Sequence, residues 1–282
     1  MGSVRVITDS ACDMPRALLD EHHIDVVPLT IRFGAEEFTD GVDLTSADFW
    51  KRCSESAQLP ETAAPAPGAF QAAYERAIDD GCDGVVVVAL SSELSATYQA
   101  AVVGAEAVAG RIDVRVVDSR NVTAAEGLLA LDTAEFASTG ASVDDVAARA
   151  TSRAGAAGLV GTLNTLDHLV KSGRVSGAKA MMGSLLSVKP LLTSRDGKIV
   201  DDGRQRTRAR ALEHIAQRAV ASGPFDWIAV AIGGGDADDL DVVVTRLRDV
   251  ATAHPLIVTE IGPVVGTHGG PGVVGVCWLT HS

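Results

Sequence analysis

Short apolar runs alternate with amphipathic segments along the first half of the chain. The runs "VRVITDS" (residues 4–10), "GVVVVAL" (84–90) and "IDVRVVDS" (112–119) are typical of strands, and four consecutive valines predict a strand buried on both faces. Amphipathic segments predict helices at residues 14–22, 43–53 and 66–81, from Ser95 onward, near 123–139 and from 143 to about 154. Strands separated by helices predict an α/β fold with a mostly parallel, doubly wound sheet.

The pattern changes near residue 155. The tract "ATSRAGAAGLVGTL" (150–163) is rich in alanine and glycine and marks a candidate boundary. Beyond it, two extended runs around "RDG" (184–205) predict a hairpin, followed by a helix over 206–221 and strands at 227–234, 256–262 and 272–280. We therefore expect two α/β domains, residues 1–155 with the parallel sheet and residues 156–282 with a mixed sheet and helices.

The composition restricts the class of partner. The 282 residues carry a formal net charge of −13, with 46% hydrophobic and 22% charged residues. Such an acidic surface is a poor match for nucleic acid or an anionic membrane. The histidines are scattered and the four cysteines stand alone, so the sequence predicts no metal site.

The same sequence favours a cytoplasmic protein. The chain goes almost directly into its first strand without a signal-peptide pattern, and no apolar run approaches the roughly 18 residues of a membrane helix. Isolated cysteines suit a reducing compartment. We expect no stable membrane insertion.

Hydroxyl-bearing residues follow several predicted strands. Ser91, Ser92 and Ser95 come after the valine run, where a strand leads into a helix. Because open α/β sheets bind ligands beyond the carboxyl ends of their strands, and helix N-termini attract anions, these serines are candidate anion ligands. Thr267 and His268 stand in a similar place in "GTHGGPG". The stretch "ETAAPAPGAF" (61–70) predicts an extended loop before a helix, with Thr62 at its head.

Several common enzyme motifs are missing from the sequence. It contains no G-x-S-x-G elbow and no P-loop, and no intact G-x-G-x-x-G follows the first strand. The glycine-rich "GGGDADD" (233–239) predicts a turn, because its acidic residues would repel a phosphate. A serine triad assembled from Ser92, His268 and Asp9 remains an alternative. Its competitor is a capping role for Asp9 at the end of a strand.

Eight stretches together resemble the DegV family. In chain order they are "TDSACDMP", "TAAPAPGAF", "LSSELSATYQAA", "VVDS", "TLDHLVKSGRVSG", "VKPLLTSRDGKI", "RQRTRARA" and "GTHGGPGVVG". The set spans residue 8 to about residue 275. One departure is Ala96, where the family commonly has glycine.

The resemblance implies a long-chain fatty acid, such as palmitate or oleate, held between two α/β domains. It implies a non-enzymatic carrier that presents the fatty acid carboxylate to an ATP-dependent fatty acid kinase subunit of bacteria, which makes an acyl phosphate for phospholipid metabolism. No cofactor is implied. Alternatives are a serine-dependent esterase or acyltransferase, and a lipid sensor.

The resemblance also implies roles for particular residues. The carboxylate is expected to bind Thr62 and one serine at the helix N-terminus, with Ser92 preferred and Ser91 and Ser95 as alternatives, and the family histidine falls on His268. Arg174, Arg206 and Thr267 are expected to support the site or to face a partner. The tail needs an apolar tunnel, for which residues 180–188 ("AMMGSLLSV") are a candidate wall.

Overall fold

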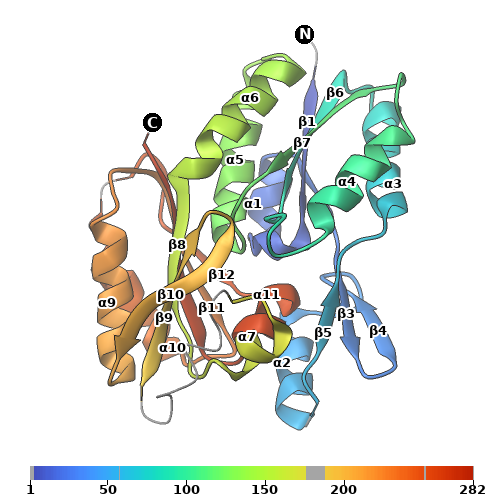
Figure 1. Cartoon of the computed structure of the whole chain (residues 1–282). Coiled ribbons are helices and arrows are strands. Elements are labelled where there is room, and N and C mark those ends of the chain that lie inside the picture. The colour runs from blue at the N-terminus through green and yellow to red at the C-terminus, as the bar shows by residue number, and fades with distance from the viewer. Residues whose placement is uncertain (1–2, 57, 176–187, 251, 282) are drawn as a thin grey trace.

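The computed structural model describes residues 3–56, 58–175, 188–250 and 252–281. Within these residues the strands form sheets of four, six and three strands. Figure 1 shows the four-stranded and six-stranded sheets on either side of helix α5 (Ala124–Ser138). The three-stranded sheet lies below the four-stranded sheet in the same view.

The four-stranded sheet is parallel throughout, as the alternation of strands and helices predicts. Its spatial order is β2 (Ile24–Val27), β1 (Val4–Asp9), β6 (Gly84–Ala89) and β7 (Asp113–Asp118). All six residues of β6 are buried, because helices cover both faces of the sheet.

The valine run of β6 divides its side chains between those two faces. Val85 and Val87 pack in the cluster of α3 (Pro67–Asp79) and α4 (Thr97–Glu106). Val86 and Val88 face the opposite cluster. That second layer contains α1 (Arg16–Glu21), α5 and α6 (Val143–Arg153). The doubly wound arrangement expected from the sequence is therefore confirmed.

The six-stranded sheet is mixed, with one parallel pair, β11 and β12, among antiparallel neighbours. Helices α9 (Arg208–Val220) and α10 (Ala237–Leu247) cover one face of it, and α5 contacts the other. Its spatial order is β10 (Lys198–Gln205), β9 (Lys189–Arg195), β8 (Ala157–Thr162), β13 (Val273–Thr280), β11 (Phe225–Gly233) and β12 (Ile257–Glu260).

Helix α5 joins the two larger sheets into one core. Twelve of its 15 residues are buried. It packs against β1 and β6 on one side and against β8, β11 and β13 on the other. Strands β1, β2, β6 and β7 of the first half thus form one large sheet, and the strands within residues 157–280 form the other. A single apolar cluster crosses between them. The division near residue 155, which falls within the short helix η2 (Ala154–Ala156), stays a prediction about domains.

The three-stranded sheet was not predicted. Its order is β4 (Glu36–Thr39), β3 (Thr30–Phe33) and β5 (Glu61–Ala63), and α2 (Ser46–Glu55) follows β4 in the chain. The apolar segment at residues 24–33 is divided between β2 and β3, which belong to different sheets. The expected loop at Thr62 is also wrong, because Glu61–Ala63 pairs with β3.

Trp50 of α2 packs against glycines of the six-stranded half. A Cβ atom built on Gly234 would lie 2.6 Å from the Trp50 ring, and one on Gly266 would lie 2.8 Å from it. Gly234 also has φ +55, the left-handed region that favours glycine. It lies in a bend directly after β11, so the turn predicted at "GGGDADD" (233–239) is confirmed at residues 234–236 only, since α10 begins at Ala237.

We expect Gly234→Ala to lower the free energy of unfolding by about 2 kcal/mol, through overpacking against Trp50 together with backbone strain. Gly41→Ala is the matched control, because Gly41 has φ +71 but no heavy atom within 4 Å of its added Cβ. The control should cost only about 1 kcal/mol, from the left-handed backbone alone. Urea unfolding of both variants measures the difference, and equal losses would show that the Trp50 contact contributes nothing.

Candidate functional site

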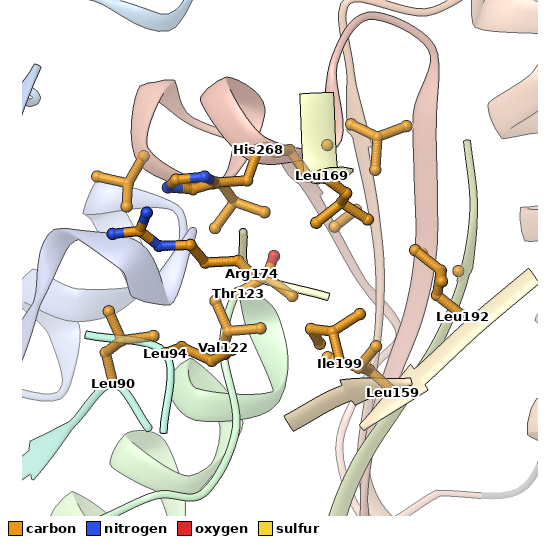
Figure 2. Close-up of a pocket in the computed structure, with 18 of the residues that line it drawn as sticks. Leu90, Leu94, Val122, Thr123, Leu159, Leu169, Arg174, Leu192, Ile199 and His268 are labelled. Carbon is orange, nitrogen blue, oxygen red and sulfur yellow. The ribbon is translucent and has the colours of Figure 1, made fainter. Parts of the chain in front are cut away.

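A cavity of about 250 Å³ lies between the two larger sheets. Most of its lining is apolar and comes from both halves of the chain: Leu29, Leu90, Leu94 and Val122 from the first half, and Leu159, Leu169, Leu192, Ile199, Ile261, Val264 and Val273 from the second. Figure 2 shows His268 and Arg174 on one side of this cavity and Leu159, Leu192 and Ile199 on the other. The cavity therefore has one polar side and one apolar side.

Thr62 and His268 meet at the polar side. Thr62 is the middle residue of β5, and His268 lies in the last turn of α11 (Pro263–Gly269). The Thr62 Oγ1 and His268 Nε2 atoms are 2.9 Å apart, although the residues are 206 positions apart in the chain. Both line the cavity, as the family resemblance implies for the carboxylate site.

The pair retains one unused hydrogen-bond donor. Burial, with smaller contributions from Arg174 and His168, lowers the pKa of His268 to about 4, so the imidazole is neutral near pH 7. Its Nδ1 atom is buried without a partner. If Thr62 donates to Nε2, the imidazole carries its proton on Nδ1; if Nε2–H donates, the Thr62 hydroxyl proton is free. In either arrangement one proton can be donated to an anion.

Ser95 is the serine that faces this cavity. It lines the cavity two residues before α4 begins. Its Oγ atom lies 2.8 Å from Thr97 Oγ1 and accepts a hydrogen bond from the Thr97 backbone N–H at 3.3 Å. The N-terminus of the ten-residue helix α4 adds a favourable field for an anion.

Ser91 and Ser92, by contrast, lie outside the cavity lining. The Ser92 hydroxyl donates to the Asp118 carboxylate at the end of β7. The Ser91 hydroxyl is fully buried and donates to the carbonyl of Gly197, at the tip of the β9–β10 hairpin, at 2.7 Å. The preference for Ser92 as the cavity serine is thus not supported by the geometry, because turn and hairpin contacts occupy both hydroxyls.

The remaining predicted residues divide in the same way. Arg174, just after α7 (Asp167–Ser172), lines the cavity and is exposed, which places it at the mouth. Thr267 is buried and donates to the Pro263 carbonyl within α11, so it supports the helix that holds His268. Arg206 is exposed, lies before α9 and is not among the lining residues.

Two residues that hold the segment around His268 (residues 263–272) were missed from the sequence. Arg208 pairs with Asp239 and donates to the Gly272 carbonyl at 2.7 Å, so it is Arg208 rather than Arg206 that contacts this segment. His168 Nδ1 lies 3.1 Å from the Thr267 carbonyl oxygen. The "RTRAR" and "LDHL" motifs carry both residues, but nothing in their spacing indicates these partners.

The alternative serine triad does not assemble. Ser92 bonds to Asp118, His268 to Thr62, and Asp9 accepts from the backbone N–H groups of Leu90 and Ala11. The capping role proposed for Asp9 is confirmed, since it caps the short helix η1 (Ser10–Cys12).

The described residues hold neither a metal-binding cluster nor a membrane-spanning helix. Across residues 3–56, 58–175, 188–250 and 252–281, no group of three or more His, Cys, Asp or Glu side chains is placed to hold a metal ion. In that same part of the chain no helix has the length and apolar character to cross a membrane. Of the candidate wall at 180–188, all but Val188 lies outside the described residues.

The chain is similar to one protein family over nearly its whole length. Residues 3–281 match the model of the DegV family of uncharacterised proteins. A DegV domain-containing protein of Streptomyces coelicolor is 35% identical over 277 residues, which cover 97% of each chain.

Solved structures match over the same extent. A DegV family protein from Thermus thermophilus, described by its fatty acid binding, is 27% identical with a TM-score of 0.89, covering 99% of this chain and 100% of its own. DegV from Bacillus subtilis, described as a fatty acid binding protein, is 28% identical with a TM-score of 0.87 and 99% coverage of both chains.

Proposed function

Because the chain belongs to the DegV family, we propose that it binds a long-chain fatty acid such as palmitate or oleate in the cavity between the sheets. One observation carries this proposal: an apolar cavity has the Thr62–His268 pair at one side and the Ser95 hydroxyl in its lining. The carboxylate is held by Thr62, Ser95 and His268, and the tail extends toward Leu159, Leu192 and Ile199.

The chemistry of the lining suits an anion with a long apolar tail. A carboxylate accepts several hydrogen bonds, which hydroxyls, a neutral imidazole and a helix N-terminus supply without a fixed charge in direct contact. The tail contributes most of the affinity, since each buried CH₂ is worth about 0.8 kcal/mol. A chain of roughly sixteen carbons thus contributes on the order of 10 kcal/mol before ordering costs.

We further propose that the protein is a non-catalytic, cytoplasmic carrier for an ATP-dependent fatty acid kinase that forms an acyl phosphate. Family resemblance supports this role, and the sequence has no P-loop of its own. The exposed Arg174 at the cavity mouth supports access of a partner to the carboxylate side.

Mass spectrometry of an organic extract from the purified, denatured protein tests fatty acid binding. We expect one dominant fatty acid near one equivalent per chain. Incubation with ATP alone should give no acyl phosphate, whereas ATP with a kinase subunit should give it. A folded protein that carries no lipid and takes up no added fatty acid would contradict the binding proposal.

A further inference from the structure

On the side of the six-stranded sheet that lines the cavity, three neighbouring strands carry only glycine or alanine at one level. Gly161 of β8 pairs in register with Gly275 of β13, and Gly275 pairs with Ala231 of β11. All three residues line the cavity. We call these three residues the cavity floor. Three adjacent strands therefore present their backbone, or a single methyl group, to the cavity at the same level of the sheet.

No neighbouring side chain lies so close to Gly161 or Gly275 that these positions must be glycine. A Cβ atom built on Gly275 would meet only the Val160 carbonyl oxygen, at 3.6 Å, which is an ordinary contact. The nearest atom to a Cβ on Gly161 is the Val274 carbonyl oxygen at 3.2 Å. Gly158, on the other face of β8, differs, because its added Cβ would lie 2.9 Å from the Trp278 ring. Neither floor glycine has a positive φ. Their missing side chains leave cavity space open.

The floor adjoins the apolar side of the cavity. Leu192 of β9 pairs directly with Gly161, and Leu159 pairs with Cys277, two residues beyond Gly275. Figure 2 shows Leu159 and Leu192 together with Ile199 on the side away from His268 and Arg174. Helix α11, which carries His268, leads into the Val273 end of β13. From that end Gly275 comes before Cys277, the partner of Leu159, so a tail that runs from His268 toward Leu159 passes the floor.

We infer that the acyl tail crosses β8 and β13 over Gly161 and Gly275, and that side-chain size at positions 275 and 192 determines the longest chain that the cavity holds. This inference rests on the proposed fatty acid binding and adds a determinant of chain length to it. A side chain at 275 fills the path of the tail, whereas a smaller side chain at 192 extends the path past its present end.

Variants that change the cavity in opposite directions test the inference. Gly275→Ala and Gly275→Val narrow the path, and Leu192→Ala lengthens it. Gly68→Ala is the matched control, because Gly68 is exposed on α3 and its added Cβ meets nothing within 4 Å. Each protein is stripped of lipid, equilibrated with an equimolar mixture of saturated fatty acids from lauric to stearic acid, and extracted for mass spectrometry.

Relative to the wild type, we expect Gly275→Val to lose the longest chains, by about fourfold in affinity for each methylene excluded. Gly275→Ala should shift the profile less in the same direction, and Leu192→Ala should shift it toward longer chains. Gly68→Ala should match the wild type. Gly275→Ala keeps the test valid if the valine variant fails to fold.

Two negative results have different meanings. A wild-type protein that binds none of the mixture would overturn the proposed function itself. A wild type that binds normally, with Gly275→Ala and Leu192→Ala folded and unchanged in chain-length profile, would overturn the inference about the floor and leave fatty acid binding intact.

Discussion

The double variant Thr62→Val, Ser95→Ala is expected to bind fatty acid at least about 100-fold more weakly than the wild type. A hydrogen bond to a charged group contributes about 1.5–3 kcal/mol, so two such bonds to a carboxylate contribute about 3–6 kcal/mol. Both side chains line the cavity, and neither replacement adds volume. Affinity is measured by competition with a fluorescent fatty acid.

Ser92→Ala is the matched control for this experiment. It removes a hydroxyl only three residues from Ser95, but one that bonds to Asp118 outside the cavity lining. We expect its affinity to equal that of the wild type. If Ser92→Ala lost affinity and the double variant retained it, the carboxylate would lie elsewhere, and the sequence-based preference for Ser92 would be restored.

The choice among the three serines shows where sequence reasoning ends. The valine run and the helix after it predict a hydroxyl-rich strand end, and the structure has one. Which hydroxyl faces the ligand depends on the loop path between β6 and α4. The partners that occupy Ser91 and Ser92, Gly197 and Asp118, are 106 and 26 residues distant. Spacing within one motif carries no information about them.

The elements whose formation depends on the local sequence pattern were predictable, and those that depend on pairing with distant segments were not. The valine-rich β6 and the hairpin at "RDG" follow directly from composition and turn chemistry. The three-stranded sheet gives no such signal, because β5 is three residues long and exposed at both ends. It forms through pairing with β3, about 30 residues earlier in the chain. Yet this sheet is what places Thr62 against His268.

A buried acidic cluster beside the cavity has a separate consequence for stability. Asp9 and Glu126 are fully buried, and the Glu126 Oε2 atom has no hydrogen-bond donor. Burial, with the charge of Asp9 as the next cause, raises the pKa of Glu126 well above its usual value. Burial also raises the pKa of Asp9 to about 6 and that of Asp13 to about 8.

The direction of the pH effect follows from these raised pKa values. A carboxyl group with a higher pKa in the folded state holds its proton more tightly there than in the unfolded chain. Its stabilising contribution is complete below the unfolded pKa, near 4, and is lost as pH rises through the folded pKa. Asp9 loses its contribution by about pH 6 and Asp13 by about pH 8, and the raised pKa of Glu126 acts in the same direction. The free energy of unfolding should therefore fall from about pH 5 to about pH 8.

We expect Glu126→Gln to stabilise the protein at alkaline pH. The glutamine carbonyl can accept from Thr8 Oγ1, which lies 3.1 Å from Glu126 Oε1, and its amide can donate to Asp9 without taking up a proton. Because its pKa is raised, the Glu126 carboxyl binds a proton more tightly in the folded state than in the unfolded chain, whereas the glutamine binds none. The stability of the variant relative to the wild type should therefore increase as pH rises above about 5. Urea unfolding from about pH 5 to about pH 8 measures both slopes.

Glu55→Gln, at an exposed position near the end of α2, is the control for this last prediction and should leave the slope unchanged. Asp9 and Asp13 remain in the Glu126→Gln variant, so its unfolding free energy should still decline with pH, but less steeply than that of the wild type. Parallel curves for the two proteins would mean that Glu126 takes up no proton on folding. The wild type would then hold an ionised carboxylate without a donor on Oε2 beside Asp9, an arrangement that the cost of burying an unpaired charge argues against.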